Sequence, residues 1–406
     1  MVIDVRGFDG EPRQFLEAGE LAFAERVRDE DVPSWDAVFE ADRAVAAYDG
    51  DRIVGTAGIF SFDLTVPGGA APSAGVTIVG VHPTHRRRGI LRRMMRLQLD
   101  QVHERGEATA ILWASEGSIY QRFGYGLATM ATRLAIERDR SAFRTRREPA
   151  GTVRFIELDE AKRVLPAVHD ALLPDHPGFF SRTPAFWDSE LFRDPEHWRR
   201  GASAVFYALH ETDGRPDGYV RYRVRDNWDD SGPRSSVVLT EKMALSPAVD
   251  LDLWQFLLGI DLMSKLEAWN VAPDDPIILN VLEPRRLGLS VGDGLWLRVV
   301  DVAAALAQRG YAADGRVVLE VRDEFCAWNA GRWSLEVVDG VGRVEPTTDP
   351  AQLSCDITDL GAAYLGGFSI TELAGAARIA ELEPGAVART DAMFRTARRP
   401  WCPKVF

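Results

Sequence analysis

Two apolar runs on either side of an amphipathic helix constrain the fold of this chain more than any other feature of its sequence. Residues 74–81 (AGVTIVGV) and 108–114 (ATAILWA) are continuous apolar runs with β-branched residues, the pattern of strands buried on both faces. Between them, one face of a helix that ends near Gly106 carries Ile90, Leu91, Met94, Met95, Leu97 and Val102. Strand, crossover helix and strand within about 40 residues predict a βαβ unit.

The segments around this unit follow an order that recurs along the chain. Upstream we expect a helix over 16–28 and a hairpin of 43–49 and 52–60. Further along, the predicted elements are a hairpin of 203–210 and 218–225, a strand over 235–244, a helix over 250–267 and a strand over 277–282 (IILNVL). The second region therefore looks like a diverged copy of the first.

From about Gly294 the pattern changes. A strand-like LWLRVV leads into a helix over 301–309. The elements predicted after it are strands at 316–322, 326–329 and 333–338, then helices around 357–364, 371–381 and 385–397. Strands followed by helices indicate a separate α+β domain.

Length and composition fit three globular domains. The chain has 406 residues, of which 46% are hydrophobic and 27% charged, so apolar side chains are available for large cores. We expect a fold of the α+β (mixed α/β) class, divided into 1–150, 151–292 and 293–406.

Charge and cysteine content exclude several classes of function. The net charge is −13, from 48 Lys and Arg against 61 Asp and Glu, which disfavours nucleic acid and favours cationic partners. Cys326, Cys355 and Cys402 have no CxxC spacing, so we expect no metal site, no disulfide framework and a reducing cytoplasm. The start of the chain does not have the pattern of a signal peptide, and no apolar run is long enough for a membrane span.

The loop between the first buried strand and the helix is the strongest candidate for a binding site. It lies within VGVHPTHRRRGILRR (79–93), where Pro83 ends the strand and the helix starts at about Ile90. A helix N-terminus has free N–H groups and about half a positive charge, which suit a phosphate. Gly89 permits close approach and the arginines at 86–88 add charge, although a solvated basic turn is the alternative. The corresponding segment of the second copy, ALSPAVD, has neither Gly nor Arg, so we expect it to bind no anion.

The same loop resembles the pyrophosphate-binding motif of the GNAT acyltransferases, [Q/R]-x-x-G-x-[G/A], which bind acetyl-CoA; Leu91 departs from its small last position. A second segment, SEGSIYQRFGY (115–125), is similar to the GNAT pattern Y-x-x-x-G-[F/Y]. The resemblance implies that Tyr120 faces the sulfur of the cofactor, where a phenol of pKa near 10 can protonate a departing thiolate. Tyr125 is expected to pack in the core.

Other residues near these motifs have less specific roles. Ser115 and Glu116 follow the second strand and could contact the cofactor, but Ser115 could instead cap the short helix. No histidine stands out as a base. We expect His82 and His85, which flank the basic loop, to be surface residues, and His103 to lie on an exposed helix face.

Several motifs are far more specific together than either loop alone. They are VHPTHRRRGILR, ASEGSIYQRFGYG, the second GNAT-like copy, GLWLRV and a C-terminal domain that resembles sterol carrier proteins. Together they resemble the Eis family of actinobacterial N-acetyltransferases over essentially the whole chain. In that family the C-terminal α-carboxylate enters the N-terminal active site as general base, and the last residue is typically Phe, as Phe406 is here. A frayed tail is the alternative, and Lys404 could pair with the carboxylate and lower its basicity.

The same resemblance implies which residues bind the two substrates. Backbone groups of Val79, Gly80 and Val81 would bind the pantetheine arm of acetyl-CoA. The pyrophosphate would be held by Arg86, Arg87, Arg88, Gly89, Ile90, Leu91 and Arg92. The acceptor pocket would include Glu25 and Trp35, a pairing suited to a cation, although Glu25 on the surface and Trp35 in the core are the alternatives.

We therefore expect an acetyl-CoA-dependent N-acetyltransferase that transfers acetyl directly to an amine. Phe406 would deprotonate the amine, Tyr120 would protonate the thiolate, and backbone N–H groups near Val81 would polarise the carbonyl. The resemblance implies aminoglycoside-like, polyamine or lysine acceptors and a homohexamer. The alternative is a lipid-binding or assembly protein with a vestigial acetyltransferase site.

Overall fold

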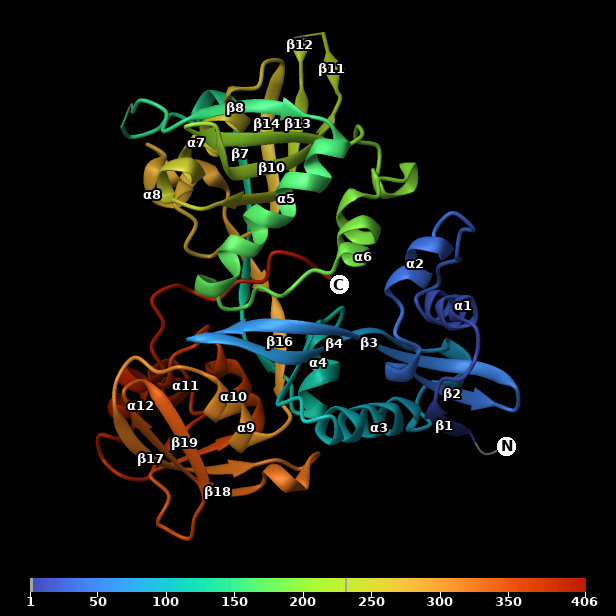
Figure 1. Cartoon of the computed structure of the whole chain (residues 1–406), viewed down its shortest axis with the longest axis vertical. Coiled ribbons are helices and arrows are strands. Elements are labelled where there is room, and N and C mark those ends of the chain that lie inside the picture. The colour runs from blue at the N-terminus through green and yellow to red at the C-terminus, as the bar shows by residue number, and fades with distance from the viewer. Residues whose placement is uncertain (1–2, 146, 231) are drawn as a thin grey trace.

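The computed structural model of the chain describes residues 3–145, 147–230 and 232–406. In these residues the strands form two seven-stranded sheets, a five-stranded sheet and a two-stranded ribbon. The first sheet lies between the second and third, and the C-terminal end of the chain lies near the centre of the molecule (Figure 1). The predicted mixed α/β class is confirmed.

The first sheet contains the predicted βαβ unit, with β4 and β5 parallel and α3 in the crossover. Its order is β1 (Asp4–Gly7), β2 (Val45–Asp49), β3 (Arg52–Val66), β4 (Gly69–Val81), β5 (Thr109–Trp113), β16 (Leu295–Val299) and β6 (Gly126–Leu127). The helices that accompany it are α1 (Pro12–Ala22), α2 (Val32–Val38), α3 (Ile90–Glu104) and α4 (Gly117–Tyr120).

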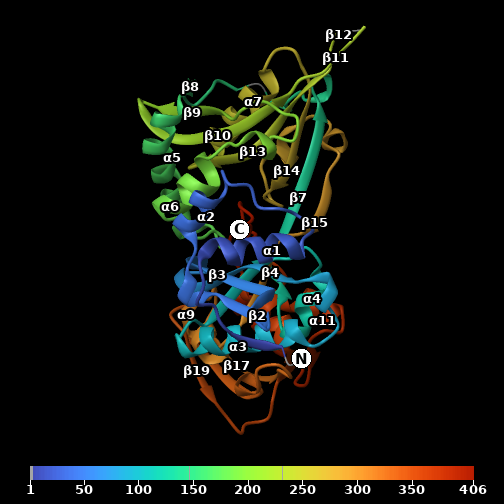
Figure 2. The same ribbon diagram turned by 90° about the vertical axis from the view of Figure 1, so that its right-hand side faces the viewer.

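The second sheet repeats this arrangement, as the sequence predicted. Its order is β15 (Ser290–Asp293), β7 (Met130–Glu137), β14 (Met263–Val271), β13 (Ser235–Ala244), β10 (Arg215–Arg225), β9 (Phe206–Thr212) and β8 (Thr152–Ile156). Its helices are α5 (Leu158–Leu172), α6 (Pro184–Phe186), α7 (Pro247–Gly259) and α8 (Ile277–Asn280). The ribbon of β11 (Trp228–Asp229) and β12 (Gly232–Pro233) projects from one side of this sheet (Figure 2).

Two sequence predictions in this region are wrong. The predicted helix over 250–267 ends at Gly259, and its last part belongs to β14. The predicted strand over 277–282 begins with α8 instead. Pro276 has no N–H to give to a ladder, and the Asp275 carboxylate accepts a hydrogen bond from the Ile277 N–H at 2.9 Å, which starts a helical turn.

The third sheet and its helices form the predicted α+β domain at the C-terminal end. The order is β19 (Val341–Pro346), β18 (Gly331–Val338), β17 (Gly315–Arg322), β20 (Leu353–Asp356) and β21 (Ala380–Glu381). The helices are α9 (Val302–Gln308), α10 (Ile357–Tyr364), α11 (Ile370–Gly375) and α12 (Ala386–Phe394). The expected strand at 326–329 is wrong, because Ala327–Asn329 is a 3₁₀ helix.

Strand pairing crosses the predicted divisions of the chain. β7 precedes the boundary expected at 150 but belongs to the second sheet, where it pairs with β14 and β15. β16 follows the boundary expected at 292 but lies between β5 and β6 of the first sheet. All five residues of β16 are buried, so this strand completes the first core rather than beginning the third.

In both large sheets the central pair of parallel strands separates towards the carboxyl ends. β4 pairs with β5 only over Ser73–Gly75, although β4 continues to Val81. β13 pairs with β14 over Ser235–Leu239 and continues to Ala244. Each opening leaves strand backbone groups without a ladder partner, so each must be filled by other hydrogen-bonding groups.

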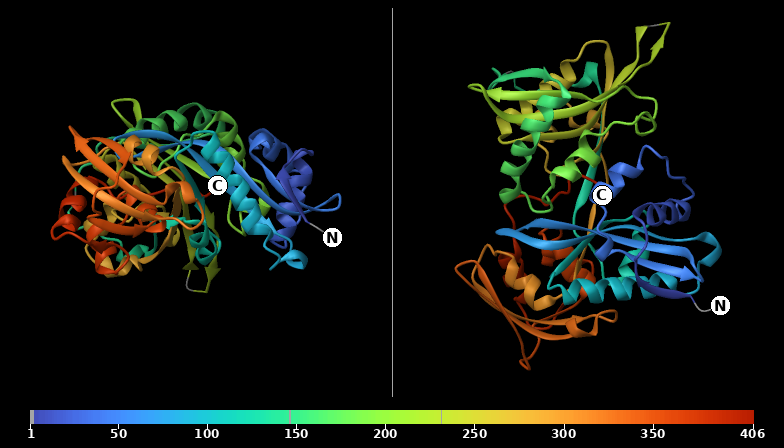
Figure 3. Two further views of the ribbon diagram at one scale, coloured as in Figure 1. Left: turned by 90° about the horizontal axis from the view of Figure 1, so that it is seen from below. Right: turned by 45° about the vertical axis from the view of Figure 1, so that its right-hand side comes forward.

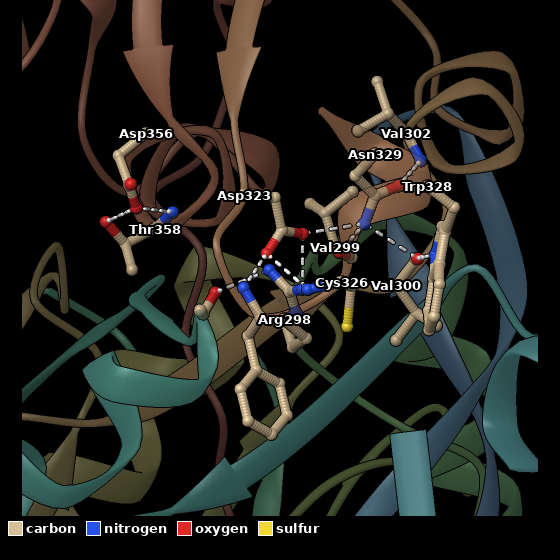
Figure 4. A network of polar contacts seen from close by, with 12 residues as sticks. Arg298, Val299, Val300, Val302, Asp323, Cys326, Trp328, Asn329, Asp356 and Thr358 are labelled. Carbon is tan, nitrogen blue, oxygen red and sulfur yellow. Dashed lines mark hydrogen bonds and ion pairs between the residues drawn. The ribbon is translucent and has the colours of Figure 1, made fainter. Parts of the chain in front are cut away.

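A buried ion pair joins the third sheet to the first, as Figure 4 shows. The Arg298 guanidinium of β16 pairs with the Asp323 carboxylate, and both side chains are almost fully buried. Asp323 also accepts hydrogen bonds from the Cys326 N–H at 2.8 Å and from the Asn329 amide at 3.0 Å. Arg298 lies so close to Gly124, which has a φ of +83°, that a Cβ there would be 2.0 Å from the guanidinium.

Loss of this pair is expected to destabilise the protein strongly. In Asp323→Ala the Arg298 charge stays buried without a partner, which costs roughly 3–5 kcal/mol in the free energy of unfolding. The matched control is Asp349→Ala, which breaks the exposed ion pair with Arg316 and costs about 0–1 kcal/mol. Urea denaturation measures both changes, and equal effects of the two variants would contradict the prediction.

Candidate active site

The basic loop joins β4 to α3 at the open end of the first sheet. After β4 a 3₁₀ helix covers Pro83–His85, and α3 begins at Ile90 without a side-chain cap. Gly89 has a φ of +72°, a left-handed conformation that glycine adopts without strain. The first turn of α3 therefore presents free N–H donors where β4 and β5 separate.

The side chains of the loop differ in what they can contact. Arg86, Arg87 and Arg88 are exposed, and none of them forms an ion pair within the described part of the chain. Ile90 is buried and Leu91 is half-buried in the core, so for these two only the backbone N–H can meet a ligand. The Arg92 guanidinium lies over the Phe325 ring, 5.1 Å from its centroid.

The two histidines beside the basic loop contact other segments of the chain. His82 is buried, with its Nε2 3.0 Å from the Ala18 carbonyl oxygen, so its predicted surface position is wrong. Burial lowers the pKa of His82, because the charged imidazolium loses its hydration. His85 Nε2 lies 3.1 Å from the Asp49 carboxylate. These contacts fix the position of the backbone immediately before Arg86.

The stretch of β4 beyond β5, which includes Val79, Gly80 and Val81, begins with a bulge. Pairing with β3 shifts register between Thr56 and Gly58, and Ile78 has a φ of +46°. The Thr56 hydroxyl donates a hydrogen bond to the Ile78 carbonyl at 2.9 Å. Positive φ at a β-branched residue is strained, and such strain is concentrated at binding and catalytic sites.

Tyr120 lies at the end of α4, on the side of the first sheet where the strands separate. Its ring packs edge-on against Tyr125 at 5.9 Å, in a cluster that also contains Val79. Burial raises the pKa of Tyr120 to about 12, because the phenolate would lose hydration. The hydroxyl is therefore protonated at neutral pH.

The residues close to Tyr120 in the sequence differ in burial and in their contacts. Tyr125 is fully buried, and its hydroxyl has no hydrogen-bond partner among the described residues. Ser115 and Glu116 are exposed between β5 and α4. Ser115 does not cap α4, because Glu116 holds the N-cap position and no side chain caps the helix.

A cavity of about 1340 Å³ separates the helices α1 and α2 of the first sheet from the face of the second sheet. Thr77 and Ile78 of the β4 bulge lie in its wall, and so do Glu25, Trp35 and Phe406. The two predicted acceptor residues are therefore brought together with the C-terminal residue. Tyr120 does not line this cavity. It lies in the apolar cluster that contains Val79 of β4.

The acceptor residues differ in exposure. Glu25 is exposed, whereas Trp35 is only 9% exposed, stacks on Phe15 at 6.4 Å and donates its indole N–H to the Pro12 carbonyl at 3.2 Å. Sequence analysis missed Glu20, which lines the same cavity and whose backbone carbonyl accepts a hydrogen bond from the Glu25 N–H at 2.9 Å. Burial, then the nearby Glu25 charge, raises the pKa of Glu20. The sequence signal that could have indicated Glu20 is that the predicted helix 16–28 carries further carboxylates besides Glu25.

The C-terminal tail runs beside the opening of the second sheet and ends at the wall of the cavity. The tail, red in Figure 3, passes from the third sheet to the space between the two large sheets. The Trp401 indole N–H donates to the Asn270 side-chain oxygen of β14 at 2.7 Å, and the Asn270 amide donates to the Cys402 carbonyl at 3.0 Å. The Trp401 backbone N–H donates to the Pro177 carbonyl at 3.0 Å. The described tail is thus held rather than frayed.

The last residues are anchored by one ion pair and by aromatic packing. The Lys404 ammonium lies 3.0 Å from the Glu190 carboxylate, so Lys404 has a partner other than the chain terminus. The Phe406 ring packs edge-on against Phe62 at 5.0 Å and against Phe180 at 5.3 Å. These contacts fix the position of Phe406 at the wall of the cavity.

Comparison with known families agrees with this architecture. Two models described as acetyltransferase (GNAT) domains match residues 8–128 and 178–299. A model described as a sterol carrier protein domain matches residues 302–403. The tandem GNAT units and the sterol-carrier-like unit that follows them are thereby confirmed.

Relatives match over nearly the whole chain. An uncharacterized N-acetyltransferase from Streptomyces avermitilis is 45% identical over 92% of this chain and 91% of its own length. N-acetyltransferase Eis from Mycobacterium tuberculosis is 34% identical over 95% of this chain and 94% of its own. This chain belongs to the Eis family of GNAT N-acetyltransferases. The crystal structure of Eis1 from Mycobacterium abscessus matches the fold of this Eis-family chain with a TM-score of 0.86 at 32% identity, covering 99% of this chain and 100% of that one.

The described ranges offer few other kinds of site. They contain no group of three or more His, Cys, Asp or Glu side chains placed to hold a metal ion. Cys326, Cys355 and Cys402 are free and buried. No described helix is long and apolar enough to cross a membrane.

Asn270 is expected to control the order of the tail. Asn270→Ala removes two hydrogen bonds to the tail, worth about 1 kcal/mol each, so amide exchange at 398–406 should accelerate roughly thirtyfold. Hydrogen–deuterium exchange measures this directly. Asn280→Ala is the control, because its amide contacts only the Pro276 carbonyl of its own helix. Unchanged exchange in Asn270→Ala would show that other contacts hold the tail.

Proposed function

We propose that this Eis-family enzyme uses acetyl-CoA and transfers the acetyl group directly to an amine of a small molecule. One observation carries this proposal. The strand opening of the first sheet has a basic helix N-terminus at one end and, beyond the β4 bulge, the cavity that contains Phe406. The corresponding opening of the second sheet is bordered by the tail, whose Trp401 side chain is hydrogen-bonded to Asn270 of β14.

The residues around the first opening fit acetyl-CoA. Arg86, Arg87 and Arg88, with the backbone N–H groups from Gly89 to Arg92, offer charge and donors to its pyrophosphate. The backbone of Val79, Gly80 and Val81 offers a free strand edge to the amides of the pantetheine arm. Ser115 and Glu116 lie at the end of β5, on the opposite side of the opening.

Tyr120 is the proposed donor to the departing thiolate. Because its pKa is raised to about 12, its hydroxyl carries a proton throughout the pH range in which amines react. A thiol has a pKa of about 8.5, so complete transfer of this proton is uphill. Hydrogen-bond donation to the forming thiolate is therefore its main contribution, and backbone N–H groups at the β4 bulge stabilise the carbonyl oxygen.

The proposed base is the α-carboxylate of Phe406, taken as the last residue of the chain. An acceptor ammonium must lose a proton before it can attack the thioester, and the Phe406 carboxylate can take it directly or through water. Since Lys404 pairs with Glu190, this cation does not lower the basicity of the carboxylate. The carboxylates Glu20 and Glu25, with Trp35, suit the incoming amine.

The acceptor class and the oligomeric state are also proposals. The acceptors implied by the family are aminoglycoside-like compounds, polyamines and lysine, and the implied assembly is a homohexamer, which sedimentation can measure. A lipid-binding function has less support, because the interior around the third sheet is filled by apolar side chains such as Leu335, Leu360 and Met393.

Tyr120→Phe is expected to lower kcat for acetyl transfer by roughly 10²-fold or more, because the donor to the thiolate is lost. Release of free thiol from acetyl-CoA with a panel of amines measures this. Tyr125→Phe is the matched control and should keep kcat within about twofold, since its hydroxyl is buried without a partner among the described residues. Full activity in Tyr120→Phe would remove it from the mechanism.

Deletion of Phe406 is expected to lower kcat by about 10²-fold, because the terminal carboxylate then lies one residue further from the site. Phe406→Leu keeps the carboxylate and an apolar side chain, and should retain most of the activity. The same thiol-release assay compares the two variants after circular dichroism has shown that both are folded. Equal rates for wild type and the deletion would exclude the carboxylate as base.

A further inference from the structure

The cavity that contains Phe406 carries more positive than negative side chains. Among the described residues of its wall, nine are Arg or Lys and five are Asp or Glu. Five of the nine cations have carboxylate partners: Arg193 pairs with Asp31, Arg199 and Arg223 with Asp194, Arg225 with Glu267 and Lys404 with Glu190. Three of these cations have a carboxylate each, whereas Arg199 and Arg223 share the single carboxylate of Asp194, so the five together offer at most about one excess positive charge to a ligand.

Four arginines in the wall remain without a carboxylate partner in the described chain: Arg26, Arg28, Arg133 and Arg200. Arg26 and Arg28 belong to the loop between α1 and α2, whereas Arg133 lies on β7 and Arg200 follows the 3₁₀ helix Glu196–Trp198. In Figure 2, the α1–α2 region faces the second sheet across the region where the chain ends. Exposed arginines without a carboxylate partner therefore line the cavity on both of its walls.

These four arginines are separate from the phosphate-binding loop. None of the arginines at 86–88 is among the described residues that line the cavity. A ligand whose phosphates lie at the N-terminus of α3 therefore leaves the cavity arginines without an anion. Their partner must come from the molecule that occupies the cavity itself.

The acidic side chains in the wall do not offset these arginines. Asp31, Glu190 and Glu267 are already paired, which leaves Glu20, Glu25 and the Phe406 α-carboxylate. Glu20 and Glu25 are neighbours in space, and burial favours the neutral form of Glu20. An acceptor with several positive charges would meet these three acidic groups and four unpaired arginines, and like charges repel in a partly enclosed space.

We propose that the acceptor carries an anionic group, a carboxylate or a phosphate, in addition to the amine that is acetylated. This inference rests on the proposed function and narrows its acceptors: it favours lysine-like amines that carry an anionic group over the polyamines and aminoglycoside-like compounds that the family implies. The amine would approach Glu20, Glu25 and the Phe406 carboxylate, and the anionic group would bind the unpaired arginines. Guanidinium groups bind both carboxylate and phosphate in bidentate fashion, so both belong to the same recognition chemistry.

Matched acceptors test the inference. Nα-acetyl-lysine and Nα-acetyl-lysine amide offer the same side-chain amine with and without a carboxylate. Phosphoethanolamine and ethanolamine make the same comparison for a phosphate. Spermidine represents polycations. We expect kcat/KM to be at least about tenfold higher for the anionic member of one pair, which identifies the anion, and spermidine to be a poorer acceptor. The preference should weaken as ionic strength rises, because salt screens the arginines.

A variant locates the effect in the cavity. Arg133→Gln should raise KM for the preferred anionic acceptor several-fold with little change in kcat, and leave the KM of its neutral partner unchanged. Arg316→Gln on the exposed face of the third sheet is the charge-matched control and should change neither value. Turnover that is equal for charged and neutral partners, or highest with spermidine, would overturn the inference while leaving the proposed function intact. Absence of turnover with every amine would overturn the proposed function itself.

Discussion

The separation of two parallel strands is the constraint on which the rest of this structure depends. Once β4 and β5 part after Gly75, the backbone groups on their facing edges lose their ladder partners. Such groups are costly to leave unpaired away from water, so the opening must be filled by solvent, a ligand or another segment of the chain. The β13–β14 opening of the second sheet poses the same requirement.

The two copies meet this requirement in different ways. In the second sheet the tail borders the opening, where Asn270 hydrogen-bonds both the Trp401 side chain and the Cys402 carbonyl. The loop of this copy, ALSPAVD, has neither Gly nor Arg and so lacks the phosphate-binding features of the basic loop. The same contacts lead the tail to the cavity, so the second copy supports the active site proposed in the first.

Sequence patterns predicted the elements whose cause is local. The apolar runs and the amphipathic helix determine the βαβ unit. The basic loop and the segment 115–125 are motifs that are continuous in the sequence. The prediction for 277–282 failed for a local reason, because the adjacent Asp275 and Pro276 start a helical turn. The predictions for His82 and β16 failed where distant residues decide the structure. His82 is buried because its ring reaches the Ala18 carbonyl of α1, and β16 joins the first sheet because β5 has an open edge. Gly124 likewise depends on Arg298, which is distant in the sequence and close in space.

The net charge of the chain does not determine the charge inside the cavity. An overall −13 favours cationic partners, but its carboxylates and guanidinium groups are spread over a chain much wider than the roughly 10 Å over which charges act at 0.1 M salt. The field inside the cavity is set by the charged side chains that line it, which come from α1, the α1–α2 loop, β7, the segment 189–200, β10, β14 and the tail. These segments meet only after both sheets have formed and the tail has docked. The charge that an acceptor experiences is therefore a property of the tertiary fold, and a molecule that is acidic on average presents a predominantly basic cavity at the site where acetyl transfer is proposed.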